Sequence, residues 1–494
     1  MPPPADDILS EIVRGLSRRC ASRFDGYLSG DPFEGRLATH QCGGTTMPSW
    51  MSSHMAATTI CLAASLSAPA FAQGFSTDAT AMFRELRRQP NDLARYMYLL
   101  EATPKLPVAD QQLALQMFAS VENELGLYDE ALRDFPLKSH IPPDDSLPTP
   151  TEWASTDAAD AITRMVTGRR LVMINEAHHD AHTRQLTLAL LPRLRALGFD
   201  YFAVEALSDK DAQLMQRGYA IEDSGTEYLR EPSYGDIVRT AIKLGFTLVA
   251  YDVGADSQEG RESGQASNLY RQTFAKDPGA RLFVHAGYAH IDKAKRRLGK
   301  VRPMAMYLQQ LSGIEPLSID QTEFREQVPP EKDAYRQLVT AFPSDGPIVL
   351  INRANGKPWS DHPGEYDMNV LLPPASSGVV DSGFLRPVSN VRASDRDHLM
   401  LPDQIIKLRP NWLARQAGRA AYPISATMCK TTFPCVIDAH FIDESSDAIA
   451  ADRYAFMRGD VVSKLYLQPG SYRLRAWGVN GKTLGEQLIT IKAR

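Results

Sequence analysis

Acidic and imidazole side chains follow four successive apolar runs of this chain, at the point where each run ends. The first run leads into Asn175-Glu176-Ala177-His178-His179-Asp180, the second into Glu205, the third into Asp252, and the fourth into His285-Ala286-Gly287-Tyr288-Ala289-His290. Carboxylates and imidazoles carry general acid-base catalysis and also bind divalent metals. These positions predict one polar site if the chain brings the ends of the runs together.

The runs have the pattern of strands in parallel βα units, which predicts an α/β domain. The expected strands are Leu171–Asn175, Tyr201–Val204, Phe246–Tyr251, Arg281–His285, Pro316–Ile319 and Pro347–Ile351. The expected helices are Thr183–Leu197, Tyr234–Leu244, Asn268–Phe274 and Met304–Leu311. Ligands bind at the carboxyl ends of parallel strands, so the polar residues are expected at one rim.

Each of these residues also has a purely structural interpretation. Glu176 fits a helix cap, Asp252 fits a turn, and His178 and His182 fit a solvated helix face. Proteins seldom place costly polar groups after consecutive apolar strands unless something binds there, so their joint placement favours a functional site. We expect His182 itself to be a solvated helix residue.

Four short motifs occur in order between residues 169 and 351. They are the strand that ends at Asn175-Glu176 with a histidine after it, the acid Glu205 after Phe202-Ala203-Val204, an Arg-acid stretch from Arg261 to Asn268, and Gly287-Tyr288-Ala289-His290. The order resembles the superfamily of the erythromycin esterases, the haem-binding ChaN-like proteins and the Tiki-type metalloproteases. Asn175 stands where the family has glycine. Either His178 or His179 matches the family histidine, and we prefer His179 for its esterase-like spacing.

The resemblance implies a hydrolase that directs water at an ester or amide of a small molecule or peptide. In one scheme Glu176, with its pKa raised by an apolar rim, is the general base and His179 or His290 shuttles the proton. Arg261 and Asn268 would bind the substrate. In a second scheme a divalent metal activates the water. Its ligands would come from Glu176, His179, Glu205, Asp252 and His290, with His178 and His285 as further candidates.

The alternative of a different class is a ChaN-like binding protein, in which a histidine at the rim ligates haem or iron. A haem absorbance band would favour uptake, and bound zinc or manganese would favour metal-assisted hydrolysis. The absence of both would favour a metal-free esterase.

An apolar segment near the start predicts export. Residues 56–72 are too short to span a bilayer comfortably, and Ala70-Phe71-Ala72 matches the pattern that signal peptidase accepts. Residues 1–72 would then be an upstream extension and a signal peptide. The mature protein would be periplasmic or secreted, without a transmembrane anchor.

Three further regions follow the predicted signal. Residues 73–140 read as a small helical cap with one tetratricopeptide-like helix pair, and residues 150–374 as the α/β domain. Residues 400–494 read as a small β-sandwich-like module. Within it we expect a hairpin from Leu465–Leu467 into Tyr472–Trp477, and a type I′ turn at Asn480-Gly481.

The charge of the chain bears on whether it binds nucleic acid, and its cysteine content bears on whether its compartment is oxidising. The net charge is −5, and no Lys/Arg-dense stretch is interleaved with aromatic residues, which argues against nucleic acid as a partner. Only Cys429 and Cys435 follow the predicted cleavage point. An even number of cysteines in an exported chain predicts a disulfide between them.

Cleavage after Ala72 is directly testable. N-terminal sequencing of secreted or periplasmic material is expected to start at Gln73. A chain that begins at Met1 and stays in the cytoplasm would contradict the prediction.

Overall fold

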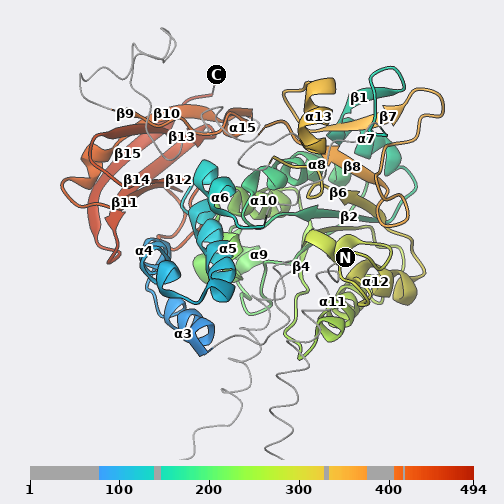
Figure 1. Ribbon diagram of the computed structural model, residues 1–494, viewed down its shortest axis with the longest axis horizontal. Coiled ribbons are helices and arrows are strands. Elements are labelled where there is room, and N and C mark those ends of the chain that lie inside the picture. The colour runs from blue at the N-terminus through green and yellow to red at the C-terminus, as the bar shows by residue number, and fades with distance from the viewer. Residues whose placement is uncertain (1–76, 138–145, 327–332, 375–404, 416–417, 494) are drawn as a thin grey trace, which may run out of the picture.

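The computed structural model describes residues 77–137, 146–326, 333–374, 405–415 and 418–493 (Figure 1). The predicted extension and signal peptide lie outside these residues. In the described part of the chain, no helix combines the length and apolarity needed to cross a membrane.

An eight-stranded, mostly parallel sheet forms the centre of the α/β region. Its order is β1-β7-β8-β6-β2-β5-β3-β4, and the pairings of β7 with β1 and β8 are antiparallel. The strands are β1 (Trp153–Asp157), β2 (Leu171–Glu176), β3 (Tyr201–Val204), β4 (Thr247–Ala250), β5 (Leu282–Gly287), β6 (Leu317–Asp320), β7 (Ile348–Asn352) and β8 (Met368–Leu371). All six expected strands are present. The sequence did not indicate β1 or β8, since β1 is polar and β8 has only four residues.

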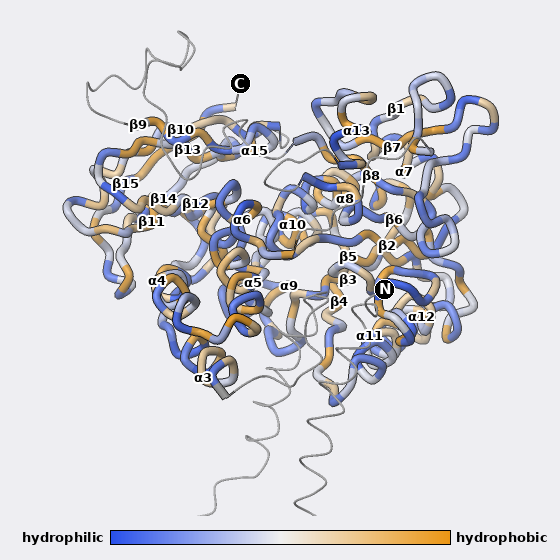
Figure 2. Tube along the Cα trace, in the orientation of Figure 1, coloured by the Kyte–Doolittle hydropathy of each residue, from blue (hydrophilic) through white to orange (hydrophobic). Residues whose placement is uncertain are grey.

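Helices cover both faces of this sheet. One face packs on α7 (Ala158–Met165), α8 (Gln185–Ala196) and α10 (Pro232–Lys243). The other packs on α11 (Gln258–Gln272) and α12 (Met304–Ser312). Beside β7 and β8 lies α13 (Ala334–Ala341). Figure 2 shows apolar residues along the central strands, as expected for parallel strands buried on both sides.

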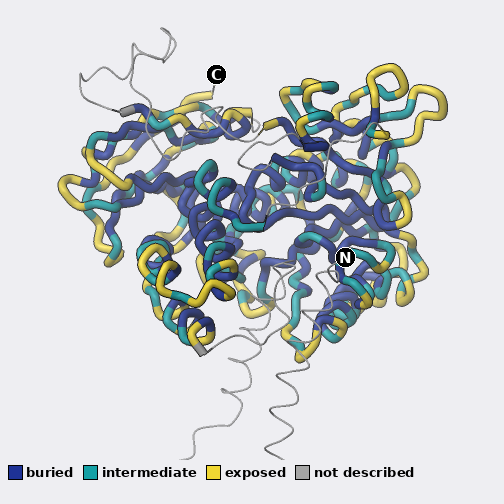
Figure 3. The backbone as a smooth tube through the Cα atoms, viewed as in Figure 1, coloured by how far each residue is buried: buried dark blue, intermediate teal, exposed yellow. Residues whose placement is uncertain are grey.

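The alternation of side chains decides which face each site residue meets. Val172 and Ile174 of β2 pack on the α8 and α10 face, whereas Met173 packs on the α11 and α12 face. Because successive side chains of a strand point to opposite faces, Glu176 lies on the same face as Val172 and Ile174, and Asn175 lies on the same face as Met173. Figure 3 shows β2 buried along its length.

The N-terminal helices and the C-terminal strands share one hydrophobic core. The helices are α3 (Thr77–Leu86), α4 (Asp92–Ala102), α5 (Val108–Glu124) and α6 (Tyr128–Asp134). One sheet has the order β10-β13-β9 and the other β12-β11-β14-β15. The strands are β9 (Ile405–Ile406), β10 (Ala420–Ser425), β11 (Cys435–Phe441), β12 (Asp452–Phe456), β13 (Val461–Leu467), β14 (Gly470–Gly478) and β15 (Thr483–Ile491), and α15 (Trp412–Arg415) precedes β10.

Two expectations for the C-terminal strands were wrong in detail. β13 and β14 do not form a hairpin, because β13 pairs with β10 and β9 while β14 pairs with β11 and β15. The turn between β14 and β15 is not type I′, because only Gly481 has positive φ and Asn480 does not. The expected common face is confirmed, since Tyr472, Leu474 and Ala476 are all buried.

The predicted disulfide is confirmed. Cys429 and Cys435 are bonded with their Cα atoms 6.0 Å apart, and both are fully buried in the shared core. The bond ties the start of β11 to the short helix η7 (Ala426–Cys429).

Gly126 joins the two parts of the shared core. It has φ of +76° in the turn between α5 and α6, and a Cβ there would lie 2.2 Å from the backbone oxygen of Arg453 in β12. The turn therefore needs glycine for two reasons, its left-handed backbone and its close approach to a strand.

Replacing Gly126 with alanine is expected to destabilise the protein by about 2–4 kcal/mol, from left-handed strain and overpacking together. Gly168→Ala is the matched control, because φ there is +77° and no atom lies within 4 Å of the added Cβ. Only the strain of about 1–2 kcal/mol should appear in the control. Urea denaturation measures both, and equal losses would refute the close-approach argument.

Candidate active site

A carboxylate and an imidazole form a buried pair at the end of β2. Oε1 of Glu176 lies 2.8 Å from Nδ1 of His178, and both side chains are at most 3% exposed. Nε2 of His178 has no hydrogen-bond partner among the described residues. The His178 ring stacks on Tyr228 at 4.1 Å. A carboxylate on Nδ1 favours the tautomer in which Nε2 carries a free lone pair.

The guanidinium of Arg184 controls the charge of this pair. Its Nε donates to Oε2 of Glu176 at 2.5 Å, and its Nη1 donates to Glu231 at 2.9 Å. Burial would raise the pKa of Glu176, but Arg184, His178 and His285 hold it well below its usual range. The expected raised pKa of Glu176 is therefore wrong. The residue is a fixed carboxylate that orients His178.

His285 lies behind the pair on the same face of the sheet. Its ring is fully buried against Tyr234, and its Nε2 is 3.9 Å from Oε2 of Glu176. Neither ring nitrogen has a hydrogen-bond partner among the described residues. Burial lowers the pKa of His285 to about 4, so this imidazole is neutral at physiological pH.

A second ionic cluster lies on the opposite face of the sheet, around Arg261 of α11. Arg261 donates to Glu205 at 2.7 Å and to Asp252 at 3.0 Å, and its Nη1 lies 3.0 Å from Nε2 of His290. Nδ1 of His290 lies 2.8 Å from Glu262. Burial opposes the charged imidazole, but Glu262 and Glu205 raise the pKa of His290 to about 10.

The two clusters meet above Gly287, at the end of β5. A Cβ on Gly287 would lie 2.6 Å from Nε2 of His178 and 3.2 Å from Oε2 of Glu205. Only glycine lets the His178 ring approach this closely. The free nitrogen of one cluster and a carboxylate of the other therefore face the same small region.

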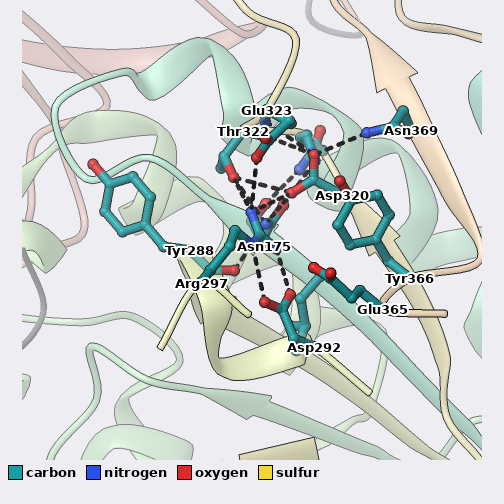
Figure 4. Close-up of polar contacts among 12 residues, drawn as sticks. Asn175, Tyr288, Asp292, Arg297, Asp320, Thr322, Glu323, Glu365, Tyr366 and Asn369 are labelled. Atoms are coloured by element: carbon teal, nitrogen blue, oxygen red, sulfur yellow. Dashed lines mark hydrogen bonds and ion pairs between the residues drawn. The ribbon is translucent and has the colours of Figure 1, made fainter. Parts of the chain in front are cut away.

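Asn175 holds the loop that carries this region, and it occupies the position where the resemblance expects glycine. Figure 4 shows its amide at the centre of a polar network. It donates to Asp320 at 2.7 Å and to the backbone oxygen of Tyr288 at 2.8 Å, and it accepts from the backbone of Gln321. Tyr288 has φ of +40°. Asn175 thus fixes a strained residue immediately after Gly287.

Three residues singled out from the sequence lie outside both the Glu176–His178 pair and the cluster around Arg261. His179 binds Tyr288 and Arg325 through its two nitrogens and stacks on Phe135 at 3.4 Å. Its preference over His178 is therefore not supported by the geometry, because only His178 contacts Glu176. Asn268 donates to the backbone of Tyr251, from a helix that begins ten residues before the expected one. His182 is not solvated, since it is 2% exposed and stacked on Trp412.

The predicted metal ligands do not gather around one point. Among the described residues, the group whose donor atoms all lie within 4.8 Å is Glu323, Asp361 and His362, and it includes none of the predicted ligands. Oδ1 of Asp252 already accepts from Arg261 and Gln265. Two buried guanidiniums also disfavour a cation, so the donor set does not fit a divalent metal. The haem alternative stays a prediction, because the contact of the His178 ring with Gly287 does not decide what Nε2 binds.

Sequence reasoning missed Arg184 and Glu231, and it passed over Glu262 and Tyr288, each of which lies within a motif. Arg184 lies on the short helix η2 (Ala181–Arg184), and Glu231 caps α10 by accepting from the backbone of Ser233 and Tyr234. The only signal for Arg184 was its position eight residues after Glu176. Nothing in the sequence pairs it with a glutamate at position 231.

No family model matches this chain, and no curated protein matches it. Similar solved structures include the type III effector HopBA1, 13% identical over 40% of this chain and 94% of that chain, with a TM-score of 0.25. A structure described as bacterial protein toxins is 13% identical over 62% of this chain and 73% of that chain, with a TM-score of 0.28. RRSP, a MARTX toxin effector domain from Vibrio vulnificus CMCP6, is 16% identical over 49% of this chain and 55% of that chain, with a TM-score of 0.25. Likeness at these scores carries no argument about activity.

The role assigned to Arg184 predicts an unequal cost for two identical chemical changes. Glu176→Gln leaves a buried guanidinium with one carboxylate fewer, which is expected to lower the free energy of unfolding by about 3 kcal/mol. Glu85→Gln removes an exposed partner of Arg88 and should cost about 0–1 kcal/mol. Urea denaturation compares them. A similar small loss in both would contradict the assignment.

Proposed function

We propose that the protein is a hydrolase in which His178 is the general base and Glu176 positions it. The observation that carries the proposal is the 2.8 Å contact between Glu176 and Nδ1 of His178, together with a free Nε2 on the same ring. A carboxylate–imidazole pair of this kind activates water or a hydroxyl group at neutral pH. An ester or amide carbonyl is the substrate group that we infer.

In the proposed reaction, Nε2 of His178 takes a proton from water while the water oxygen attacks the carbonyl carbon. The imidazolium that forms is stabilised by the ionised Glu176. When the tetrahedral intermediate collapses, His178 returns the proton to the leaving oxygen or nitrogen. Both steps use one imidazole, and no other group has to change charge.

The second cluster holds its two cations, Arg261 and His290, against the carboxylates of Glu205, Asp252 and Glu262, and it turns Oε2 of Glu205 toward the reacting region. The pKa of His290 at about 10 keeps this imidazole protonated, and Arg261 carries a permanent charge. Arg261 already binds Glu205 and Asp252, so we assign it to holding the cluster together and not to gripping a substrate.

We also propose membership of the erythromycin esterase, ChaN and Tiki superfamily for the central domain. The support is that Glu176, His178, Glu205 and His290 come from three strand ends in the expected order and lie in two adjoining clusters. Export of the chain is proposed with it. The disulfide between Cys429 and Cys435 supports an oxidising compartment.

Substituting His178 with alanine is expected to lower kcat/KM by about 10²–10⁴-fold on esters or amides found by screening, which is the usual contribution of a general base. His179→Ala is the matched control and should lose less than about tenfold.

Thermal melting separates chemistry from folding in these variants. Equal loss of activity in both histidine variants, with unchanged melting, would contradict the assignment of the base to His178. Retention of full activity in His178→Ala would refute the proposed site.

A further inference from the structure

The phenol of Tyr288 lies beside the proposed general base. Tyr288 directly follows Gly287, it is partly exposed, and its ring lies 5.2 Å from the His178 ring in a T-shaped contact. Its φ of +40° is a conformation that strains a residue with a side chain. In Figure 4 its ring extends away from the Asn175 network. The strained backbone therefore places a phenol next to His178.

The contacts of His179 fix the direction in which the Tyr288 hydroxyl donates. Nη1 of Arg325 lies 2.9 Å from Nε2 of His179. A guanidinium can only donate, so Nε2 carries the lone pair and Nδ1 carries the proton of the neutral ring. Nδ1 therefore donates to the oxygen of Tyr288, 3.2 Å away. Because this oxygen is the acceptor, Tyr288 directs its own proton elsewhere.

The hydroxyl proton of Tyr288 has no acceptor among the described residues. Burial raises the pKa of Tyr288 well above its usual range, although Arg325 opposes the shift, so the phenol stays protonated at physiological pH. The hydrogen bonds run from a permanent cation through an imidazole to the phenol, and each polarises the next. Without His179 the phenol would still carry its proton, so His179 orients the donor and does not replace it.

The reacting region needs such a donor because the cations of both clusters are already paired. Arg184 and Arg261 are each bound to two carboxylates, and His290 is bound to Glu262. Oε2 of Glu205 also faces the region. A substrate group that already carries negative charge is therefore disfavoured there. A neutral carbonyl group needs only a donor for the charge that it develops.

We propose that the Tyr288 hydroxyl is the oxyanion donor of this site and that the substrate is a neutral ester or amide. The inference rests on the proposed function of His178. As the water oxygen bonds to the carbonyl carbon and His178 takes the water proton, the π electron pair of the carbonyl moves onto its oxygen. That oxygen accepts a hydrogen bond from Tyr288, which keeps its proton. When the pair returns, the bond to the leaving group breaks and His178 protonates that group.

Hydrolysis of p-nitrophenyl acetate by the full chain tests the assignment. Tyr288→Phe keeps the ring and removes the donor, so kcat is expected to fall by about 10²–10³-fold, the usual cost of losing one oxyanion donor. KM should change much less. Tyr472→Phe removes a hydroxyl that donates to the backbone oxygen of Gln468 in the C-terminal strands, and as the matched control it should retain the wild-type kcat. Thermal melting verifies that both variants fold.

A thionoester probe separates oxyanion binding from a structural role of Tyr288. Sulfur accepts hydrogen bonds weakly, so the wild type should hydrolyse p-nitrophenyl acetate faster than its analogue with C=S in place of C=O. In Tyr288→Phe the ratio of the two kcat values is expected to fall by about tenfold or more. An unchanged ratio, or full activity in Tyr288→Phe, would overturn the assignment.

His178→Ala distinguishes a failure of this inference from a failure of the proposed function. If His178→Ala is inactive and Tyr288→Phe is fully active, only the oxyanion assignment is refuted. Full activity in His178→Ala would refute both. Hydrolysis of p-nitrophenyl phosphate as fast as that of the acetate would overturn the inferred preference for a neutral substrate.

Discussion

The arrangement of the candidate site depends on one buried guanidinium. Arg184 is fully buried between Glu176 of β2 and Glu231 at the start of α10, and it stacks over Tyr234 at 4.6 Å. Burying a charge is costly unless it is paired and hydrogen-bonded on all sides. Two carboxylates and one aromatic face meet that requirement. In return, the guanidinium keeps Glu176 ionised, and the ionised carboxylate fixes His178.

The same interaction links the site to the N-terminal helices. Tyr128 of α6 donates to Glu231, and Asn123 of α5 donates to the backbone oxygen of His178 and accepts from the backbone of Ala181. The helices in turn share a core with the C-terminal strands. The N-terminal helices therefore do more than cap the structure. It supplies polar contacts that hold the loop after β2, and this explains why three sequence regions form one connected structure.

The sequence predicted the strands well because their apolar runs are long and bounded by polar residues. It also predicted that Glu176, Glu205, Asp252 and His290 would reach one end of the sheet, since parallel strands share a direction. It did not predict the partners. Arg184 and Glu231 are 47 residues apart, and their pairing depends on the packing of η2 against α10. The choice between His178 and His179 has the same limit, because motif spacing does not report which ring contacts the carboxylate.

The alternation of the strands explains why the site consists of two clusters and not one. Glu176 and His285 point toward α8 and α10, whereas Glu205 points toward α11, so the sheet itself separates them. The separation places the neutral imidazole of His285 in one cluster and the protonated imidazole of His290 in the other, and each cluster has its own arginine. Contact between them is possible only where the sheet ends. Gly287 has no side chain at that point, so the His178 ring can lie over the strand end and face Glu205. A single glycine thus brings two oppositely directed sets of side chains to one small region.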